Sequence, residues 1–168
     1  MQNVYIDFDG VLGVFDTSKS LEEVAAAGYS LTLPMIQNMC QAVNMLRLDP
    51  DLNKRYDVKL LSAIINEQAG DDKTEVLRRE FDDDFADKAV FVRYGESKAP
   101  YAQDNILLDD FSHNLHEWES NGGIGIKVYN GINGNHGSWH GYAVQTTARP
   151  EVIYHTVKGI LNQLPTTD

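Results

Sequence analysis

The chain has 168 residues, of which 42% are hydrophobic and 23% charged, as in one globular domain rather than a disordered chain. Its single cysteine, Cys40, excludes an intramolecular disulfide. Acidic residues outnumber basic ones by 25 to 14, and the net charge of -11 disfavours binding to duplex nucleic acid. No signal peptide or membrane-spanning run is visible, so we expect a cytoplasmic protein with no membrane partner.

Short apolar segments alternate with segments of helical periodicity along the chain. The expected strands are residues 3–8, 56–61, 89–92, 105–108 and 124–128. The expected helices are residues 20–27, 33–48, 71–85, 111–120 and 151–164. This alternation predicts one α/β domain over residues 1–168, with a Rossmann-like parallel sheet sandwiched by helices. Residues 16–55 place two helices between the first two strands, where one crossover would suffice.

Two carboxylates follow the first expected strand. Because side chains alternate along a strand, Asp7 and Asp9 can face the same side while Phe8 enters the core. Carboxylates this close repel each other unless a cation lies between them or one stays protonated. Gly10 lets the chain leave the strand in a conformation that a side chain would obstruct. Taken alone, this motif is also typical of an ordinary acidic turn.

A second acidic pair, Asp109 and Asp110, follows the strand at residues 105–108. The carboxyl ends of parallel strands share one edge of a sheet, so this pair and the first are expected to converge there. Oxygen ligands of this kind suit Mg²⁺. Asp110 could also cap the helix at residues 111–120, a role compatible with metal binding.

A hydroxyl and a lysine occupy two further positions next to expected strands. Ser62 follows the strand at residues 56–61 and could donate to a phosphate oxygen, although serine is common in turns. Lys98 precedes the strand at residues 105–108 and could offset the carboxylates, although an isolated lysine is usually a surface residue. The charge balance at a phosphate site calls for at least one protonated carboxyl group or for a further positive group such as Arg93, although a surface salt bridge is the commoner role of such an arginine.

The order of these motifs resembles that of the haloacid dehalogenase-like (HAD) hydrolases, over roughly residues 4–128. The resemblance implies an HAD-like fold with residues 16–55 as a small helical cap insert. It implies that Asp7 is the nucleophile and Asp9 the general acid and base. It further implies a Mg²⁺ site formed by Asp7, Asp9, Asp109 and Asp110, a catalytic and phosphate-binding Lys98, and phosphate contacts from Ser62 and Gly10. Asp110 is favoured as the direct ligand of the acidic pair.

The region from Ile106 to Val128 is similar to the 5'(3')-deoxyribonucleotidase-like branch of that family. This similarity implies a Mg²⁺-dependent phosphomonoester hydrolase that forms an aspartyl-phosphate. The expected substrate is a small phosphorylated metabolite, in particular a nucleoside monophosphate. Three alternatives stay open, namely a catalytically silent Mg²⁺- or nucleotide-binding module, a sugar-phosphate phosphatase and a phosphatase of polynucleotide ends.

A Gly- and Asn-rich loop at residues 130–141 is unusually long. Its His136, Trp139 and His140 could close over a substrate, and the indole of Trp139 could stack on a base. A plain surface hairpin is an equally supported interpretation. His113 and His116 lie three residues apart on one expected helix face, where solvent exposure is a better interpretation than metal binding.

Overall fold

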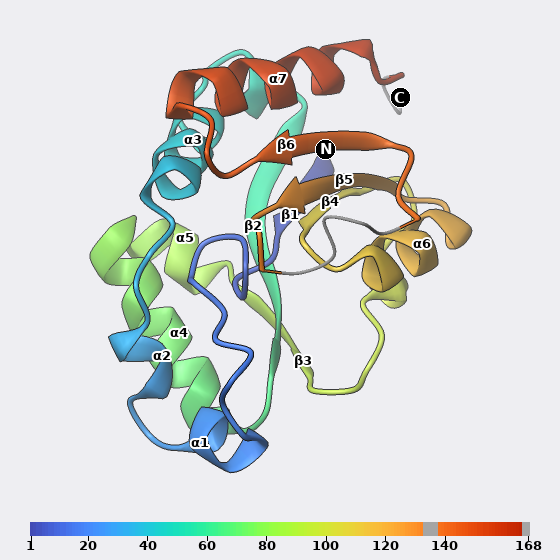
Figure 1. Cartoon of the computed structure of the whole chain (residues 1–168). Coiled ribbons are helices and arrows are strands. Elements are labelled where there is room, and N and C mark those ends of the chain that lie inside the picture. Colours follow the sequence, from blue (N-terminus) through green and yellow to red (C-terminus); the bar gives the residue numbers. More distant parts are fainter. Residues whose placement is uncertain (133–137, 166–168) are drawn as a thin grey trace.

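The protein is described by a computed structural model that covers residues 1–132 and 138–165 (Figure 1). Within these residues, one sheet contains six strands in the order β3-β2-β1-β4-β5-β6. The strands are β1 (Gln2–Ile6), β2 (Tyr56–Ile64), β3 (Val90–Arg93), β4 (Ile106–Asp109), β5 (Ile124–Tyr129) and β6 (Tyr142–Gln145). Each neighbouring pair is parallel, which confirms the expected Rossmann-like sheet.

Helices cover both faces of this sheet. The α-helices are α1 (Leu21–Ala25), α2 (Tyr29–Thr32), α3 (Gln37–Arg47), α4 (Glu67–Glu80), α5 (Asp83–Asp87), α6 (Ser112–Ser120) and α7 (Pro150–Gln163). The 3₁₀ turns are η1 (Leu52–Lys54) and η2 (Ala99–Tyr101). Within the part of the chain that the structure describes, every helix is too short or too polar to cross a membrane.

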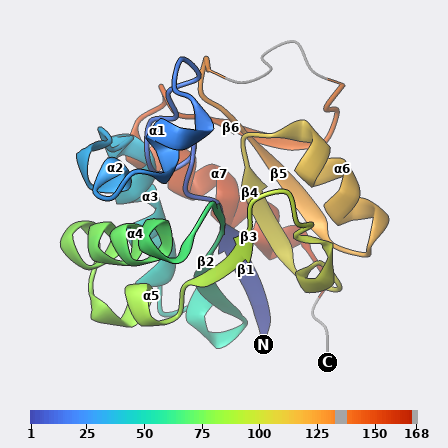
Figure 2. The same cartoon turned by 90° about the horizontal axis from the view of Figure 1, so that it is seen from below.

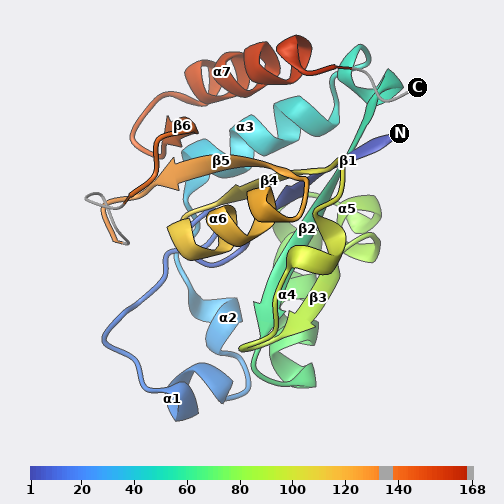
Figure 3. The same ribbon diagram turned by 90° about the vertical axis from the view of Figure 1, so that its right-hand side faces the viewer.

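The core is divided into two layers by the sheet. Alternate residues of β1 point to opposite sides: Val4 and Ile6 join a cluster with α3, α4, α5 and α7, whereas Tyr5 joins a cluster with α6 and η2. Figure 3 shows α7 and α3 together on one side of the strands and α6 on the other. Because both faces are covered, the strands are nearly continuous apolar runs, as is usual in parallel sheets.

The expected helix at residues 71–85 is two helices. The first of them, α4, begins earlier than expected, after Asn66, whose side chain accepts a hydrogen bond from the Ala69 amide. It ends at Phe81, where the backbone leaves the helical region, and Asp82 then caps α5 by accepting from the Phe85 amide at 2.9 Å. The three consecutive aspartates at residues 82–84 therefore lie at the start of a helix, which is the position that the helix dipole favours for negative charge.

β6 corresponds to none of the expected strands. The chain between β5 and β6 is a crossover, because the two strands are parallel. Because β5 and β6 are parallel, residues 130–141 must return to the opposite end of the sheet. The interpretation of this loop as a surface hairpin is therefore wrong, since a hairpin joins antiparallel strands. Ala143 and Val144 are too few for a clear strand signal, and the exposed Tyr142 obscures the alternation.

The expected insert at residues 16–55 has two structurally different parts. The amphipathic α3 buries five residues and packs against α7 in the core. The short α1 and α2 lie away from α7, beside α4 (Figures 2 and 3). They are held there by hydrogen bonds from the Gly28 amide to Asp72 Oδ2 at 2.7 Å and from Asn66 Nδ2 to the Ala25 carbonyl at 3.0 Å. The extent of a cap stays a prediction.

Candidate active site

Three buried carboxylates meet at the carboxyl edge of the two central strands. Asp7 follows β1, and its amide donates to the carbonyl of Leu108 in β4 at 2.9 Å, which fixes the two strand ends side by side. One carboxylate oxygen from each of Asp7, Asp109 and Asp110 lies within 4.8 Å of the others. The chain reverses its strand order between β1 and β4, and ligands bind at such points in open α/β sheets.

Lys98 lies between two of these carboxylates. Its Nζ is 3.0 Å from Asp7 Oδ1 and 2.8 Å from Asp109 Oδ2, and only 5% of the residue is exposed. Burial alone would lower the pKa of Lys98, but the charges of Asp109 and Asp7 outweigh burial and raise it well above its ordinary value. Lys98 is thus a fixed positive charge at the site.

Asp7 is held in an environment that disfavours its charge. Burial is the largest cause that raises the pKa of Asp7, to about 7. The ammonium of Lys98 opposes this rise, whereas the carboxylates of Asp109, Asp9 and Asp110 add to it. A divalent cation at this position would displace the proton and leave Asp7 as the anion.

Asp109 and Asp110 differ in their surroundings. Asp109 Oδ1 accepts from the Phe111 amide at 2.8 Å, and its Oδ2 accepts from Lys98 and, at 2.9 Å, from Asn114 Nδ2. Both oxygens of Asp109 are therefore occupied by donors of the chain. Asp110 Oδ2 accepts from Asn130 Nδ2 at 2.8 Å. These contacts place Asp109 beside Lys98 as the residue that positions it. Asp110 as the direct ligand of a cation stays a prediction.

Gly10 has a structural role that differs from the expected phosphate contact. Its amide donates to the Gly13 carbonyl at 2.8 Å and is therefore used within the turn. Its φ is +76°, and a Cβ placed on it would lie 2.1 Å from Asp110 Oδ2. The expected phosphate contact is thus corrected: Gly10 is required because the backbone turns sharply there and passes directly beside Asp110.

Lys73 of α4 is a site residue that the sequence analysis missed. Its Nζ donates to Asp9 Oδ2 at 2.6 Å, to Ser62 Oγ at 3.1 Å and to the Ala63 carbonyl at 2.8 Å, and only 4% of the residue is exposed. The positive group expected from Arg93 is supplied here, since Arg93 is exposed. Ser62 lies within β2 rather than after it and is fully buried. A lysine on the helix that follows the strand of Ser62 was the available signal.

Two polar residues at the carboxyl end of β5 support the acidic pair, and the sequence did not indicate either of them. Asn130 Nδ2 donates to the Gly10 carbonyl at 2.7 Å as well as to Asp110, and so joins the two strand-end loops. Lys127, which is 1% exposed, donates from Nζ to the carbonyl of Asp110 and to Ser112 Oγ. Burial lowers the pKa of Lys127.

Of the three loop residues expected to contact a substrate, Trp139 and His140 lie within the described part of the chain. Trp139 is 6% exposed, belongs to the cluster on the α6 face and donates from Nε1 to the Tyr142 carbonyl at 2.9 Å. The expectation that Trp139 stacks on a base is therefore wrong, because its indole packs over β5 in the core. His136 lies outside the described residues, and His140 is exposed.

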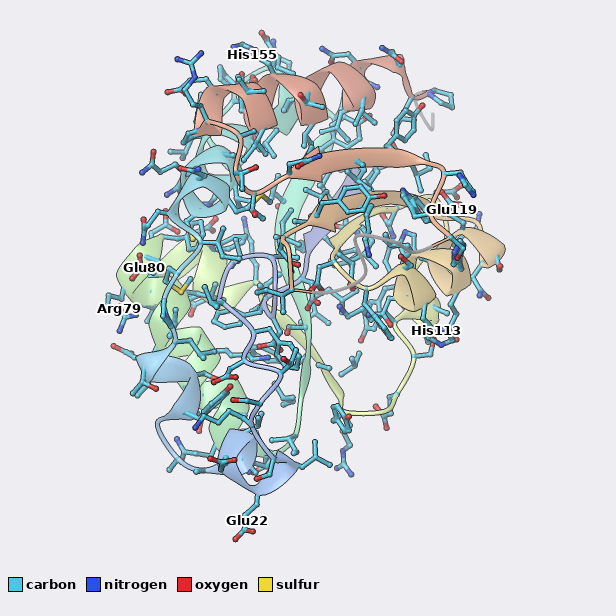
Figure 4. The ribbon with its side chains drawn as sticks, in the orientation of Figure 1. Glu22, Arg79, Glu80, His113, Glu119 and His155 are labelled. Carbon is cyan, nitrogen blue, oxygen red and sulfur yellow. The ribbon has the colours of Figure 1, made fainter. Side chains whose placement is uncertain are left out.

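The histidines of α6 lie apart from the site. Figure 4 shows His113 on the outer side of this helix, where the residue is exposed. His116 contacts Ser138 Oγ at 3.0 Å and packs against the ring of Trp139. Both histidines are exposed, which agrees with the interpretation of this helix face as solvent-exposed.

The carboxylate cluster fits a divalent cation. Its donors are carboxylate oxygens only, which suits Mg²⁺ better than Zn²⁺. The raised pKa of Asp7 shows that the protein alone does not fully balance the negative charge of this carboxylate. Among the residues described, Asp7, Asp109 and Asp110 each offer a carboxylate oxygen that could hold this ion.

A cavity of about 220 Å³ opens directly beside the cluster. Asp7, Asp9 and Asp110 lie at one end of it, together with Lys73. The remaining wall comes from the loop before α1, from α1 and α2, from the end of β2 and from the residues after β3 and β4. A small molecule in this cavity can therefore contact the carboxylates and the α1–α2 segment at the same time.

Comparisons with known proteins give matches in structure alone. No family model matches the chain. No curated protein matches its sequence. Among solved structures, 13 chains match.

Two of these structures are bacterial sugar-bisphosphate phosphatases. One is D,D-heptose 1,7-bisphosphate phosphatase from Burkholderia thailandensis, with a TM-score of 0.60, 11% identity, and coverage of 95% of this chain and 99% of that one. The other is D,D-heptose 1,7-bisphosphate phosphatase from B. bronchiseptica complexed with magnesium and phosphate, with a TM-score of 0.65, 10% identity, and coverage of 98% and 100%. At these identities the likeness shows that the protein has the fold of these two phosphatases over nearly its whole length.

Proposed function

We propose that the protein is a Mg²⁺-dependent phosphomonoester hydrolase that forms an aspartyl-phosphate on Asp7. The observation that carries this proposal is the convergence of Asp7, Asp109 and Asp110 around one point, with Lys98 between Asp7 and Asp109. The fold shared with two phosphatases, one of them complexed with magnesium and phosphate, supports it. So does the resemblance of the motif order to HAD hydrolases.

The proposed reaction has two steps. The carboxylate of Asp7 attacks phosphorus while Asp9 donates a proton to the departing alcohol oxygen, and Asp9 then removes a proton from the water that cleaves the aspartyl-phosphate. Asp9 is partly exposed, with 32% of its side chain accessible, so it can reach both the departing oxygen and water. Asp7, Asp110 and the Asp9 carbonyl would hold Mg²⁺, which would supply charge stabilisation for the phosphoryl oxygens when bound.

The two lysines have distinct tasks in this mechanism. Lys98 balances the charge between Asp7 and Asp109, so that the nucleophile keeps one orientation. Lys73 holds Asp9 and Ser62 together on the opposite side and lines the cavity, where it offers a positive charge to the phosphoryl group. Electrostatic stabilisation by such fixed groups contributes strongly to phosphoryl transfer.

The proposed substrate is a small phosphorylated metabolite, with nucleoside monophosphates as the first candidates. The test is hydrolysis of 4-nitrophenyl phosphate and of a panel of nucleoside and sugar monophosphates, with Mg²⁺ and with EDTA. The proposal predicts turnover that EDTA abolishes and that Asp7→Asn removes. Asp71→Asn, an exposed carboxylate of α4, is the matched control and should retain activity. Absence of metal-dependent turnover throughout the panel would favour a silent binding module.

A further inference from the structure

The cavity beside the carboxylates is apolar along most of its length. Beyond the carboxylate end, its wall is formed by aliphatic and aromatic side chains. These are Phe15, Leu21, Val24, Ala63, Ile64, Ile65, Ala69, Tyr94 and Phe111. The part of the cavity away from the carboxylates is therefore hydrophobic. This part would receive the group of a substrate that is attached to phosphate.

The mouth of this cavity gathers large apolar side chains that are exposed to solvent. Leu21 is 56% exposed, Tyr94 is 63% exposed and Phe111 is 52% exposed, and all three line the cavity. They come from three separate segments: α1, the loop after β3 and the residue before α6. Exposed apolar side chains that cluster from distant segments mark binding surfaces, whereas scattered ones do not.

Polar groups are few in the same wall, and one of them has no partner. Apart from the lysine and carboxylates at the catalytic end, the polar side-chain groups of the lining belong to Lys19, Ser30 and the hydroxyls of Tyr29 and Tyr94. Lys19 pairs with Glu23 at 3.2 Å. Tyr29 Oη is buried and has no hydrogen-bond partner among the residues that the structure describes. This wall does not present the set of donors and acceptors that several hydroxyl groups would need.

We propose that this cavity binds the leaving group of the substrate and selects a planar, weakly polar ring over a polyhydroxylated chain. This inference rests on the proposed function. A sugar placed against Leu21, Val24 and Ile65 would lose hydrogen bonds to water without replacement. A flat ring gains from the same contacts, since aromatic rings bury a large apolar area at little cost in conformational freedom. Nucleobases and simple aryl groups share this chemistry.

The test compares phosphomonoesters that differ in the ring. Thymidine 5'-monophosphate and 2-deoxyribose 5-phosphate carry the same phosphorylated sugar with and without a base. Glucose 6-phosphate supplies the polyol, and 1-naphthyl phosphate supplies an aryl ring without a sugar. We expect kcat/KM to be at least about tenfold higher for the ring-bearing compounds. The relative dissociation constants of the nucleotide and the naphthyl ester then identify the source of the ring, because naphthol is the better leaving group and raises the rate whatever the cavity binds.

Variants of the cavity mouth test where the preference arises. Leu21→Ala and Tyr94→Ala should each lower kcat/KM for the ring-bearing compounds about three- to tenfold and leave 2-deoxyribose 5-phosphate unchanged. Leu48→Ala and Tyr142→Ala are matched controls, because these side chains are exposed by 66% and 40% and do not line the cavity. An equal loss of kcat/KM for the ring-bearing compounds in Leu21→Ala and Leu48→Ala would show that the cavity does not cause the preference for a ring.

A binding measurement separates this inference from the proposed function. Calorimetry with the Asp7→Asn protein and Mg²⁺ should give a dissociation constant at least about tenfold lower for 1-naphthyl phosphate than for glucose 6-phosphate. This preference is expected even if the wild-type protein hydrolyses none of the compounds, a result that would overturn the proposed function alone. Equal binding, or equal kcat/KM with and without the ring, would overturn the inference.

Discussion

Asp110 Oδ2 lies 2.1 Å from the position that a Cβ atom on Gly10 would occupy. The two residues come from loops that follow β1 and β4, and Asn130 Nδ2 contacts both, at the Gly10 carbonyl and at Asp110 Oδ2. The position of the proposed metal ligand is thus set by the absence of a side chain about 100 residues earlier in the chain.

Gly10→Ala is therefore expected to abolish activity by displacing Asp110. Metal-dependent phosphatase activity should fall by at least about 100-fold, because the carboxylate can no longer reach the ion. Gly95→Ala is the matched control: its φ is +86°, yet a Cβ there meets nothing within 4 Å. It should carry the backbone strain of about 1–2 kcal/mol and keep its activity. Similar activity in the two variants would contradict the role assigned to Gly10.

Lys98→Met is expected to destabilise the fold as well as to inactivate the site. Removing the lysine leaves Asp7 and Asp109 buried without their positive partner, which costs about 3–5 kcal/mol in the free energy of unfolding. Urea denaturation measures this change. Lys88→Met, in which a lysine with 42% of its side chain exposed is removed, should cost less than about 1 kcal/mol. A Lys98 variant as stable as the wild type would show that the buried pair is not needed.

Mg²⁺ affinity is expected to depend on pH through Asp7. Since the pKa of Asp7 is raised to about 7 in the metal-free protein, Asp7 keeps its proton below that pH and Mg²⁺ must displace it. The association constant should rise about tenfold per pH unit up to pH 7 and level off above it. Calorimetry in buffers of different ionisation enthalpy detects the released proton. A constant affinity between pH 5 and pH 8 would exclude Asp7 as the titrating ligand.

Asp49 links α7 to the loop after α3, and it makes the fold sensitive to acid. It accepts hydrogen bonds from Tyr154 Oη at 2.6 Å and from Lys158 Nζ at 2.5 Å. Burial alone would raise the pKa of Asp49, but these hydrogen bonds outweigh burial and lower it. Its stabilising effect is therefore complete above the ordinary aspartate pKa of about 4 and is lost as the pH falls through the lower pKa of the folded state.

Asp49→Asn should accordingly lower the free energy of unfolding by about 1.5–3 kcal/mol at pH 7. The difference from the wild type should shrink as the pH falls below about 4, since Asp49 is then protonated in the unfolded and finally in the folded protein. Asp51→Asn, in an exposed pair with Lys54, is the control and should leave the free energy of unfolding close to that of the wild type. A pH-independent difference between Asp49→Asn and the wild type would contradict this account.

Much of the sheet was predictable because its strands are buried on both faces. The expected strands at residues 3–8 and 56–61 overlap β1 and β2, and Asp7 and Asp109 meet where parallel strands place them. Strand boundaries were less accurate: β2 continues to Ile64, so Ser62 lies inside it. Ser62 interrupts the apolar run, although Ala63 and Ile64 continue it to the end of the strand.

The supporting residues of the site could not be predicted from local pattern. Lys73 reads as an ordinary surface lysine of a helix, and only the packing of α4 beside β2 brings it to Asp9 and Ser62. Trp139 lies in a Gly-rich loop whose composition indicates exposure, yet the crossover to β6 buries its ring. Both outcomes depend on contacts between distant segments, which sequence periodicity does not encode.

The aspartyl-phosphate on Asp7 can be tested by trapping it. Rapid quenching during turnover of a phosphomonoester with Mg²⁺, followed by borohydride reduction, converts a phosphorylated aspartate to homoserine, which peptide mass spectrometry locates. The account predicts homoserine at position 7 in the wild-type protein, and none when EDTA is present or when Asp7 is changed to asparagine. Turnover without modification of Asp7, or with modification at Asp9, Asp109 or Asp110 instead, would contradict it.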